Sequence, residues 1–248
     1  MMKVTLLAHT PEPEKMVAAA ARLCYSNAQD VETLLAGLAN EKVDKFLEKL
    51  GEMVNHGTPY EHPVFTFAIE GVSRALTHQL VRHRIASFDQ QSQRYTNSEG
   101  FGYVIPPSIM ANDELRIKMR GICGEINKFL HDCENAGIPK EDARFLLPNA
   151  TESRLLCTMN ARSLAHFFSL RCCARAQWEI RQLANEMFKL AKEAAPRLFV
   201  DAAACDQLGY CPEGHMSCGK KPTLEELKKA YTLMKFDAAM AKKMTGGK

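Results

Sequence analysis

The chain has 248 residues, of which 46% are hydrophobic and 25% are charged, and its formal net charge is +3. These values are ordinary for a globular protein and argue against a surface that binds polyanions throughout, but they allow a local basic pocket. No apolar run is long enough to span a bilayer and the N-terminus lacks a signal-peptide pattern, so we expect a cytoplasmic protein. The nine cysteines fit no small disulfide scaffold, and most are expected to be reduced.

The N-terminal part of the chain begins with an extended pattern. We expect a strand over 3–9, followed by a helix over 10–25 with Thr10 as its N-cap. A second amphipathic helix is expected over 40–57, because apolar residues recur there at helical spacing.

The middle of the chain alternates between the two patterns. The segment 62–71 alternates between apolar and polar residues and is rich in β-branched and aromatic side chains, which predicts a strand. A helix is expected over 72–84. A loop rich in Asn, Ser, Gly and Pro follows over 96–108. It leads to a long helix over 112–137, which ends at a glycine.

The rest of the chain is mainly helical. A short helix bounded by prolines is expected over 139–148, and a strand over 150–160. The pattern over 161–195 is strongly helical but broken near Cys172 and Cys173. A basic amphipathic helix is expected over 223–244. No repeat or linker is present, so the order predicts mixed α and β elements around one core.

The segment "LVRHRIASFDQQSQRY", residues 80–95, is dense in cations and contains a single acid. Neighbouring residues on a helix point about 100° apart, so Arg82, His83 and Arg84 can face one cleft only if the helix ends among them. Guanidinium groups bind phosphate oxygens in pairs. The segment therefore predicts an anion-binding site, and a solvated basic face with salt bridges is the alternative.

Two further polar constellations lie next to predicted strands. "HGTPYEHPVF", residues 56–65, places polar side chains just before a strand, where binding groups are common. "NARSLAHFFSLRCCARAQWEI", residues 160–180, embeds arginines and His166 in an apolar helix. Buried cations need partners, which here are either acids of a neighbouring helix or the phosphate or carboxylate of a ligand.

Together these constellations resemble the flavin-dependent thymidylate synthases. The family signature is Arg-His-Arg, seven residues and a serine, which here runs from Arg82 through "IASFDQQ" to Ser92. "HGTPYEHPVFTF" before it and "NARSLAHFFSLR" after it stand in the family order. The resemblance covers about residues 1–200, which we expect to form one synthase domain. Residues 201–248 are expected to form a cysteine-containing extension with a terminal helix.

The resemblance implies an α/β (α+β) fold with a central, mostly antiparallel sheet flanked by helices. It implies a homotetramer in which subunits share active sites. The implied reaction is the reductive methylation of dUMP to dTMP, with 5,10-methylenetetrahydrofolate as carbon donor, reduced FAD as hydride source and NADPH as reductant of the flavin. The sequence carries neither a Rossmann glycine fingerprint nor a Walker loop.

The implied dUMP site consists of glutamine, serine and arginine side chains. Carried over residue by residue, these are Gln79, Arg82, Gln90, Gln91, Ser92, Gln93, Arg94, Arg144 and Arg171. Arg171 and Ser92 are the catalytic candidates. Arg171 would stabilise negative charge near the uracil carbonyl, whereas Ser92 would hold the phosphate. No cysteine is expected to attack the pyrimidine, and Ser92 as nucleophile is the less favoured alternative.

The implied FAD site draws on all three constellations. Its residues are His56, Thr58, Glu61, Arg82, His83, Arg84, Ile85, Asn160, Arg162 and His166. Two positions depart from the usual pattern, since His166 stands where relatives often carry Asn, and Arg175 where they often carry His.

The extension carries a C-x5-C-x3-H-x2-C series formed by Cys205, Cys211, His215 and Cys218. Three thiolates and one imidazole suit tetrahedral zinc, but this spacing matches no common zinc finger. We therefore expect no metal, and free thiols or one cysteine pair instead.

Two other classes of function compete with the enzyme. A nucleic-acid-binding module would run Arg74, Arg82, Arg84 and Arg94 along a backbone, with aromatic residues stacking on bases. A zinc-stabilised interaction protein would make the cysteine tail central. Neither explains three separate motifs in order, so we expect small-molecule substrates and neither nucleic acid nor membrane as a partner.

Overall fold

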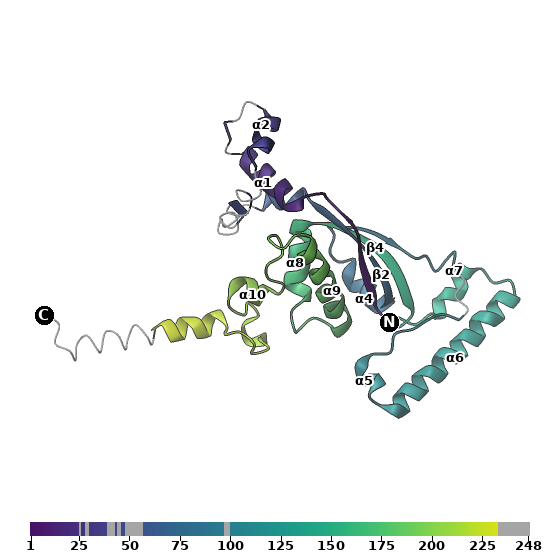
Figure 1. The fold of residues 1–248 in the computed structure, drawn as a ribbon. Helices are drawn as coiled ribbons and strands as arrows, with labels where there is room; N and C mark the ends of the chain where they lie inside the picture. The colour runs from purple at the N-terminus through teal and green to yellow at the C-terminus, as the bar shows by residue number, and fades with distance from the viewer. Residues whose placement is uncertain are drawn as a thin grey trace, which may run out of the picture.

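The computed structural model describes residues 1–24, 26–27, 30–38, 43, 46–47, 57–96 and 100–232. It contains one four-stranded sheet whose strands are, in spatial order, β1 (Lys3–His9), β2 (Val64–Ser73), β4 (Glu152–Asn160) and β3 (Ser87–Gln90). Every neighbouring pair of strands is antiparallel. Three helices pack against the sheet: α4 (Arg74–Leu80), α8 (Ala161–Arg171) and α9 (Trp178–Ala194) (Figure 1). The predicted class, an antiparallel sheet flanked by helices, is confirmed.

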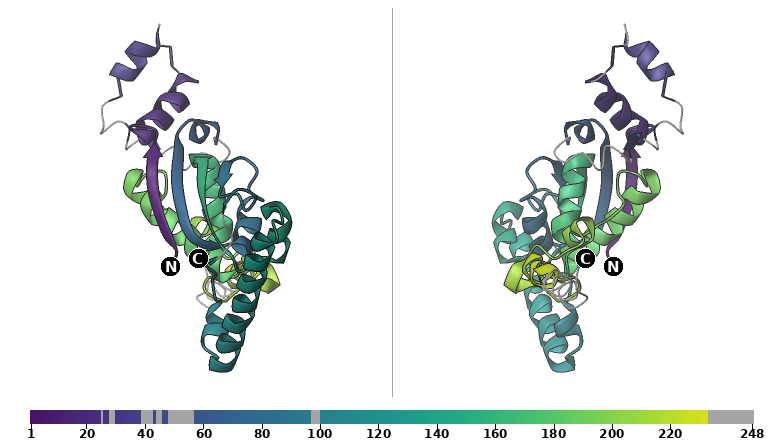
Figure 2. Two further views of the ribbon diagram at one scale, coloured as in Figure 1. Left: turned by 90° about the vertical axis from the view of Figure 1, so that its right-hand side faces the viewer. Right: turned by 90° about the vertical axis from the view of Figure 1, so that its left-hand side faces the viewer.

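Buried and more exposed side chains alternate along β2 and β4, so the sheet has one buried face. Phe65 and Phe67 of β2 are fully buried and stand opposite Met159 and Cys157 of β4. Burial of a large apolar side chain contributes about 1.5–3 kcal/mol relative to leaving it exposed. Helices α8 and α9 lie on the same side of the sheet, where they cover this face (Figure 2). The strands predicted over 62–71 and 150–160 are therefore confirmed.

The helical pattern over 161–195 is interrupted after Arg171, as predicted. Cys172 is the C-cap of α8, and α9 begins after Gln177. The Gln177 side chain accepts hydrogen bonds from Glu179 N at 3.0 Å and Ile180 N at 3.1 Å, which satisfies two of the unpaired N–H groups of the new helix. The break lets both halves of the pattern pack against the sheet.

The first predicted helix begins later than expected. It is α1 (Pro13–Leu23), and its N-cap is Glu12, in the left-handed region with a φ of 45°. Thr10 instead joins the end of β1 to β2: its N–H donates to Val64 O and its Oγ1 accepts from Val64 N, both at 3.0 Å. Because the N–H and Oγ1 of Thr10 are hydrogen-bonded to Val64, Thr10 does not cap α1, and the prediction that it is the N-cap is wrong.

Two further segments near the N-terminus differ from the predicted pattern. A short helix, α2 (Val31–Ala36), is capped by Asp30, which accepts from Thr33 N at 2.6 Å. It was not predicted from the sequence. The helix predicted over 40–57 lies largely outside the described residues.

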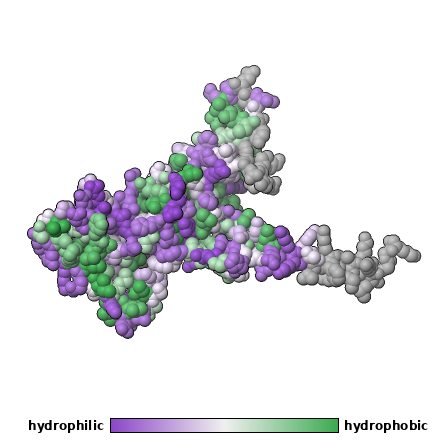
Figure 3. All heavy atoms as spheres, turned by 180° about the vertical axis from the view of Figure 1, so that it is seen from behind, coloured by the Kyte–Doolittle hydropathy of each residue, from purple (hydrophilic) through white to green (hydrophobic). Residues whose placement is uncertain are grey.

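The helix predicted over 112–137 is confirmed as α6 (Asp113–Asn135), capped by Asn112. It forms an arm beside the sheet together with α5 (Pro107–Met110), α7 (Lys140–Ala143) and the 3-10 helix η2 (Arg144–Leu146) (Figure 1). The main contacts of α6 are with α5 and α7. Large apolar side chains therefore stay exposed on the arm (Figure 3), among them Leu115, Ile117, Ile122 and Phe129.

Beyond α9, the chain forms α10 (Ala204–Leu208), the 3-10 helix η3 (Gly214–Met216) and a helical stretch over 224–232. The last stretch starts with a reciprocal cap, because Glu226 N donates to Thr223 Oγ1 at 3.2 Å and Thr223 N donates to Glu226 Oε2 at 2.7 Å. This is the start predicted for the terminal helix, whose remainder lies outside the described residues. None of the helices in the described ranges combines the length and the apolar character needed to cross a membrane.

Candidate active site

The Arg-His-Arg segment lies in a turn directly after α4. The helix ends at Leu80, four residues before the predicted end at Arg84, and His83 N donates to Leu80 O at 3.1 Å. Because the helix ends before the segment, its side chains do not follow the helical spacing. Arg82, His83 and Arg84 therefore line one cavity.

The opposite wall of this cavity comes from the junction of β4 and α8. Asn160 ends β4 and caps α8, accepting a hydrogen bond from Ser163 N at 2.8 Å. Arg162, His166 and Leu170 follow at four-residue intervals, which places them on one face of α8. All five residues line the cavity.

We call this space the RHR cavity. Its volume is about 820 Å³, within the range of roughly 300–1,000 Å³ that is usual for small-molecule sites. Residues far apart in the sequence line it: Glu61, Arg82, His83, Arg84, Ile85, Asn160, Arg162, Ser163, His166, Leu170 and Arg171. Glu61 reaches it from the 3-10 helix η1 (Thr58–Glu61), which precedes β2.

Positive charge dominates the RHR cavity. Its described lining contains four guanidinium groups, from Arg82, Arg84, Arg162 and Arg171, but only one carboxylate, that of Glu61. Glu61 accepts a hydrogen bond from Arg162 Nη1 and so compensates one of the four charges. The remaining guanidinium groups favour an anionic ligand, and their planar forks suit phosphate oxygens.

His83 links the two walls of the RHR cavity. Arg171 Nε donates to His83 Nε2 at 3.1 Å, and the imidazole packs edge-on against buried Phe167 with ring centroids 5.0 Å apart. Burial, with the nearby charges of Arg171 and His166, lowers the pKa of His83 from 6.5 to about 4. His83 is therefore neutral near pH 7 and orients Arg171 without adding a charge.

A second group of candidate residues surrounds Glu141 of α7. Arg94 Nη2 lies 2.6 Å from Glu141 Oε2, and Arg144 Nε donates to Glu141 O at 3.2 Å. Ser92 Oγ accepts from Arg94 N at 3.2 Å. We call Ser92, Arg94, Glu141 and Arg144 the α7 cluster.

Arg74, the first residue of α4, lies near the α7 cluster. Its Nη2 donates to Gln91 O at 3.0 Å, whereas its Nε is buried and has no hydrogen-bond partner among the residues that the structure describes. Burial and the nearby charge of Arg144 lower the pKa of Arg74. Two neighbouring guanidinium groups, one with an unused N–H, are suited to binding a shared anion.

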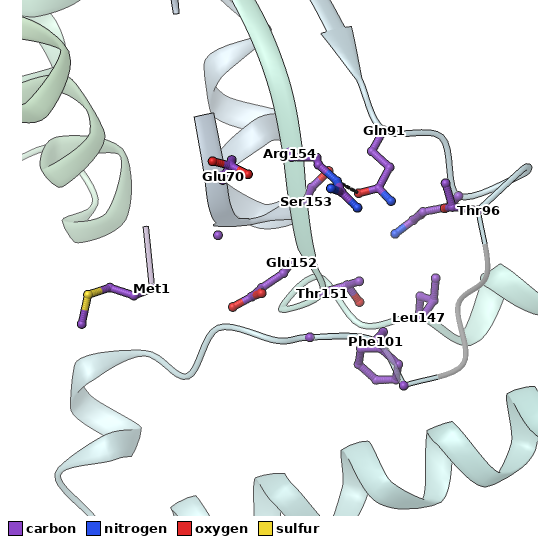
Figure 4. Close-up of a pocket in the computed structure, with 14 residues that line it drawn as sticks. Met1, Glu70, Gln91, Thr96, Phe101, Leu147, Thr151, Glu152, Ser153 and Arg154 are labelled. Atoms are coloured by element: carbon purple, nitrogen blue, oxygen red, sulfur yellow. Dashed lines mark hydrogen bonds between the residues drawn. The ribbon is translucent and has the colours of Figure 1, made fainter. Parts of the chain in front are cut away.

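A second cavity, of about 440 Å³, lies at the end of the sheet, and Figure 4 shows its residues. We call it the sheet-end cavity. Gln91 and Gln93 line it, and the Gln91 side chain accepts from Arg154 Nε at 3.0 Å, drawn as a dashed line in Figure 4. Gln90 is tied to β4 instead, since its Nε2 donates to Ser153 Oγ at 2.9 Å.

Comparisons with known proteins identify the family. The family described as thymidylate synthase complementing protein (Thy1) matches residues 5–197. A flavin-dependent thymidylate synthase of Geobacter sulfurreducens is 49% identical over 231 residues, which cover 91% of this chain and 97% of that protein. The chain belongs to the flavin-dependent thymidylate synthase family. Its sequence resemblance to that family is thereby confirmed.

One further relative and one solved structure agree with this assignment and with the fold, respectively. A relative of that name from Clostridium tetani is 48% identical over 246 residues, covering 93% of this chain and 97% of that protein. The crystal structure of a UMP/dUMP methylase, PolB from Streptomyces cacaoi bound with 5-Br dUMP, shares the fold with a TM-score of 0.69. It is 24% identical and covers 80% of this chain and 93% of that chain.

The structure gathers most of the residues that the family resemblance assigns to FAD. Eight of the ten line the RHR cavity: Glu61, Arg82, His83, Arg84, Ile85, Asn160, Arg162 and His166. Thr58 lies in η1 beside the cavity and is exposed. His56 lies outside the described residues.

The residues that the family resemblance assigns to dUMP are divided within one chain. Arg82 and Arg171 line the RHR cavity, the α7 cluster holds three more, and Gln91 and Gln93 line the sheet-end cavity. Gln79 lies on α4, where its Nε2 donates to Ala75 O at 3.5 Å, and Gln90 lies on β3. A single chain therefore does not bring the whole set together.

Three residues near these groups were missed by sequence reasoning. Ser163 and Leu170 line the RHR cavity, and their signal was available, since Leu170 lies four residues after His166 on the same helix face. Arg74 was considered only as a contact to a nucleic-acid backbone. Its position beside Arg144 depends on the fold and has no local sequence signal.

The cysteine series lies beyond the family match and forms no metal centre in the described part of the chain. There, no three His, Cys, Asp or Glu side chains gather so that they could hold a metal ion. All nine cysteines are free. Cys205, Cys211 and Cys218 line a third cavity, but His215 is exposed in η3 and does not line it. The structure therefore does not assemble the zinc ligand set weighed from the sequence.

Proposed function

We propose that this protein is a flavin-dependent thymidylate synthase that converts dUMP to dTMP. 5,10-Methylenetetrahydrofolate gives its one-carbon unit to C5 of the uracil, and NADPH is the source of the reducing electrons. The observation that carries the proposal is the RHR cavity, where the family signature places guanidinium groups around a space of about 820 Å³. The names of the relatives that match nearly the whole chain support the same reaction.

The RHR cavity suits FAD in size and in charge. Arg82 and Arg84 supply planar donors for the pyrophosphate, and Arg162, which is paired with Glu61, adds its remaining N–H groups. Ile85 and Leu170 supply apolar surface for the rings. His56, Thr58, Glu61, His83, Asn160 and His166 complete the proposed FAD set. Bound FAD supplies, in its reduced form, the hydride that completes the methyl group.

The α7 cluster and Arg74 suit the phosphate of dUMP. Ser92 and the neighbouring backbone N–H groups donate to its oxygens, and Arg94, Arg144 and Arg74 neutralise its charge. Arg94 must then leave Glu141, with which it pairs in the structure. Gln79, Gln90, Gln91 and Gln93 position the nucleotide, together with Arg82 and Arg171.

Arg171 acts at the uracil ring. His83 holds its guanidinium group in one orientation, so it can stabilise the negative charge that develops on a ring carbonyl as C5 becomes nucleophilic. No cysteine is among the described residues that line the RHR cavity, and burial raises the pKa of both Cys157 and Cys172 to about 12, so these two thiols are poorly suited to attack the ring. Ser92 contacts Arg94 N rather than a base, so we assign it to the phosphate.

We also propose that the enzyme is a homotetramer with shared active sites. Ile117, Ile122 and Phe129 are 66%, 54% and 46% exposed on the arm, which favours burial against another copy of the chain. The residues assigned to dUMP lie in separate groups within one chain, which supports an assembly in which two chains complete each site. Residues 1–200 then form the synthase domain and 201–248 an extension. Reduced thiols agree with a cytoplasmic location.

The absorption spectrum of the purified protein tests the cofactor. We expect flavin bands that bleach with NADPH and return in air. With methylenetetrahydrofolate present, the protein should release tritium from C5 of labelled dUMP. A colourless protein that binds no added FAD and releases no tritium would refute the proposal. No observation favours a second function: of the arginines weighed for nucleic acid, Arg82 and Arg84 line a cavity, whereas Arg94 pairs with Glu141 and Arg74 donates to Gln91 O.

A further inference from the structure

A third cavity lies where the extension meets the end of α8. Its volume is about 410 Å³, and we call it the C-terminal cavity. Five of its lining residues are cysteines: Cys172, Cys173, Cys205, Cys211 and Cys218. Residues from 203 to 221 supply much of its wall, and the family match ends at residue 197. The cavity therefore depends on a part of the chain that the family signature does not describe.

The C-terminal cavity adjoins the RHR cavity. Leu170 lines both spaces and is 46% exposed. Arg171, the next residue, lines the RHR cavity, whereas Cys172 lines the C-terminal cavity. A long ligand bound in the RHR cavity can therefore extend over the apolar Leu170 side chain into the C-terminal cavity.

Part of the lining of the C-terminal cavity is apolar. Ala203, Ala204 and Pro212 line it beside the cysteines. Burial, with the nearby charge of Asp206, raises the pKa of Cys172 to about 12, so this thiol is protonated. A protonated thiol behaves as a small apolar group. The wall therefore suits an aromatic ring better than a metal ion.

The C-terminal cavity also carries ammonium groups that lack an acidic partner. Lys220 and Lys221 line it, and neither forms an ion pair within the described residues. Arg175, by contrast, is paired with Glu213, which attaches the extension to the loop after α8. Asp206 also lines the cavity, so its three cations and two carboxylates leave one net positive charge. Two ammonium groups without an ion pair, beside apolar side chains, fit a ligand that has an aromatic body and several carboxylates.

We propose that the C-terminal cavity binds the aminobenzoyl-glutamate tail of the folate co-substrate. This inference rests on the proposed function, in which the folate co-substrate reacts beside the FAD of the RHR cavity; we place its pterin ring at the edge of that cavity next to Leu170. The aminobenzoyl ring then lies over Leu170 and the thiol-lined wall, and the glutamate carboxylates meet Lys220 and Lys221. Each additional glutamate adds one carboxylate, so a longer tail binds more tightly.

The kinetic test compares monoglutamyl and pentaglutamyl methylenetetrahydrofolate. In the wild type, we expect a lower KM for the pentaglutamate. The double variant Lys220→Ala/Lys221→Ala should raise that KM about tenfold, the order expected for losing two solvent-exposed charge contacts. KM for the monoglutamate should change much less, and flavin content and KM for dUMP should stay as in the wild type.

The matched control is Lys228→Ala/Lys229→Ala, which removes the same charge from the terminal helix outside the cavity. It should leave the KM for the pentaglutamate unchanged. If both double variants raise the KM for the pentaglutamate equally, the effect depends on the overall charge of the protein rather than on the cavity, and the proposal is overturned. The proposal also fails if Lys220→Ala/Lys221→Ala leaves the KM for the pentaglutamate unchanged.

A binding test separates this inference from the proposed reaction. The probe is p-aminobenzoyl-pentaglutamate, the tail without its pterin, titrated calorimetrically into the FAD-loaded chain. We expect binding by the wild type and about tenfold weaker binding by Lys220→Ala/Lys221→Ala. Lysine-dependent binding supports the cavity even if no tritium is released from dUMP, a result that counts against the reaction alone. Absent or lysine-independent binding overturns the inference even in an active synthase.

Discussion

His83 shows how one residue sets the charge of the RHR cavity. Its Nε2 accepts a hydrogen bond from Arg171, so protonation at Nε2 breaks that bond and places two cations side by side. The pKa of His83 in the folded chain is about 4, below the ordinary value of 6.5. At pH values between 4 and 6.5 the unfolded chain binds more protons than the folded chain. The contribution of His83 to the free energy of unfolding is therefore fully present above about pH 6.5 and is lost as the pH falls towards 4.

We therefore predict that His83 titrates near pH 4 and that Arg171→Met moves the midpoint up towards 6.5. The cause is the loss of one neighbouring positive charge. NMR of labelled histidine rings measures both midpoints. In urea unfolding, His83→Gln should flatten the loss of stability between pH 6.5 and 4. A wild-type midpoint at 6.5 or above would contradict a neutral, partly buried His83.

Arg74 gives a prediction about substrate affinity. Its Nε has no hydrogen-bond partner in the described ranges, and its charge lies near that of Arg144, so a bound phosphate would satisfy both groups. A hydrogen bond to a charged group contributes about 1.5–3 kcal/mol. Arg74→Met should therefore raise KM for dUMP at least tenfold, with a smaller change in kcat and an unchanged flavin content.

The matched control for Arg74 is Arg116→Met on α6, which removes a guanidinium group that pairs only with Asp113 and Met110 O among the described residues. Steady-state rates at varied dUMP should be those of the wild type for this control. Equal KM values for Arg74→Met and the wild type would exclude Arg74 from the phosphate site.

At the residue scale, the sequence predicts what the motifs themselves contain. Carried over from the family resemblance, the three motifs named eight FAD residues that line the RHR cavity. The partners of these residues are not predictable in the same way. Glu141 pairs with Arg94 across 47 positions of the chain, and no local pattern encodes such a contact.

At the scale of elements, buried hydrogen bonds join α9 to the start of α4. Glu179, in the first turn of α9, is 2% exposed and accepts from Ser73 N at 2.7 Å and also from Ser73 Oγ. Ser73 Oγ in turn caps α4 by accepting from Leu76 N at 3.0 Å. Since α4 leads directly into the Arg-His-Arg turn, this contact helps to place the turn relative to α8 and α9.

We predict that Glu179→Ala lowers the free energy of unfolding by about 3 kcal/mol, because it leaves two buried donors of Ser73 without a partner. Glu179→Gln keeps one acceptor oxygen, so it should lower the free energy of unfolding by less than Glu179→Ala does. The comparison is Glu186→Ala, a half-exposed position of the same helix whose carboxylate pairs only with Lys189 among the described residues, where a change within about 0.5 kcal/mol is expected. Urea unfolding measures all three, and similar losses for Glu179→Ala and Glu186→Ala would disprove the role of Glu179.

Elements with strong periodicity were predictable, and those set by tertiary contacts were not. β2, β4, α6, α8 and α9 follow from alternating or helical apolar patterns. β3 is only four residues long and mostly polar, and it forms because Ser87 to Gln90 pair with β4. Thr10 has the chemistry of an N-cap, but pairing with Val64 took precedence. Sequence spacing alone does not decide between these two uses of one threonine.

At the scale of the whole molecule, the arm and the divided site point to the same assembly. α6 exposes apolar side chains that a second copy can bury, and the residues assigned to dUMP lie in separate groups. If the RHR cavity of one subunit faces the α7 cluster of another, each complete site combines two chains. The sequence could suggest this arrangement only through the family, because an interface leaves no motif of its own.

This arrangement predicts that two inactive variants restore activity in mixed oligomers. Arg94→Ala damages the α7 cluster and Arg171→Ala damages the RHR cavity, so each alone should release almost no tritium from dUMP. When differently tagged chains are co-expressed and purified through both tags, some sites pair an intact RHR cavity with an intact α7 cluster. Random pairing of equal amounts gives about a quarter of the wild-type activity.

The control for restored activity adds Ile117→Glu and Phe129→Glu to both chains. Placing charges on the exposed face of α6 should weaken the contact between copies, which light scattering after size-exclusion chromatography measures as a lower mass. Restoration should then disappear together with the oligomer. Mixed oligomers that show only the summed activity of the two variants would mean that each site is built within one chain, and the divided residues would then have to move together when dUMP binds.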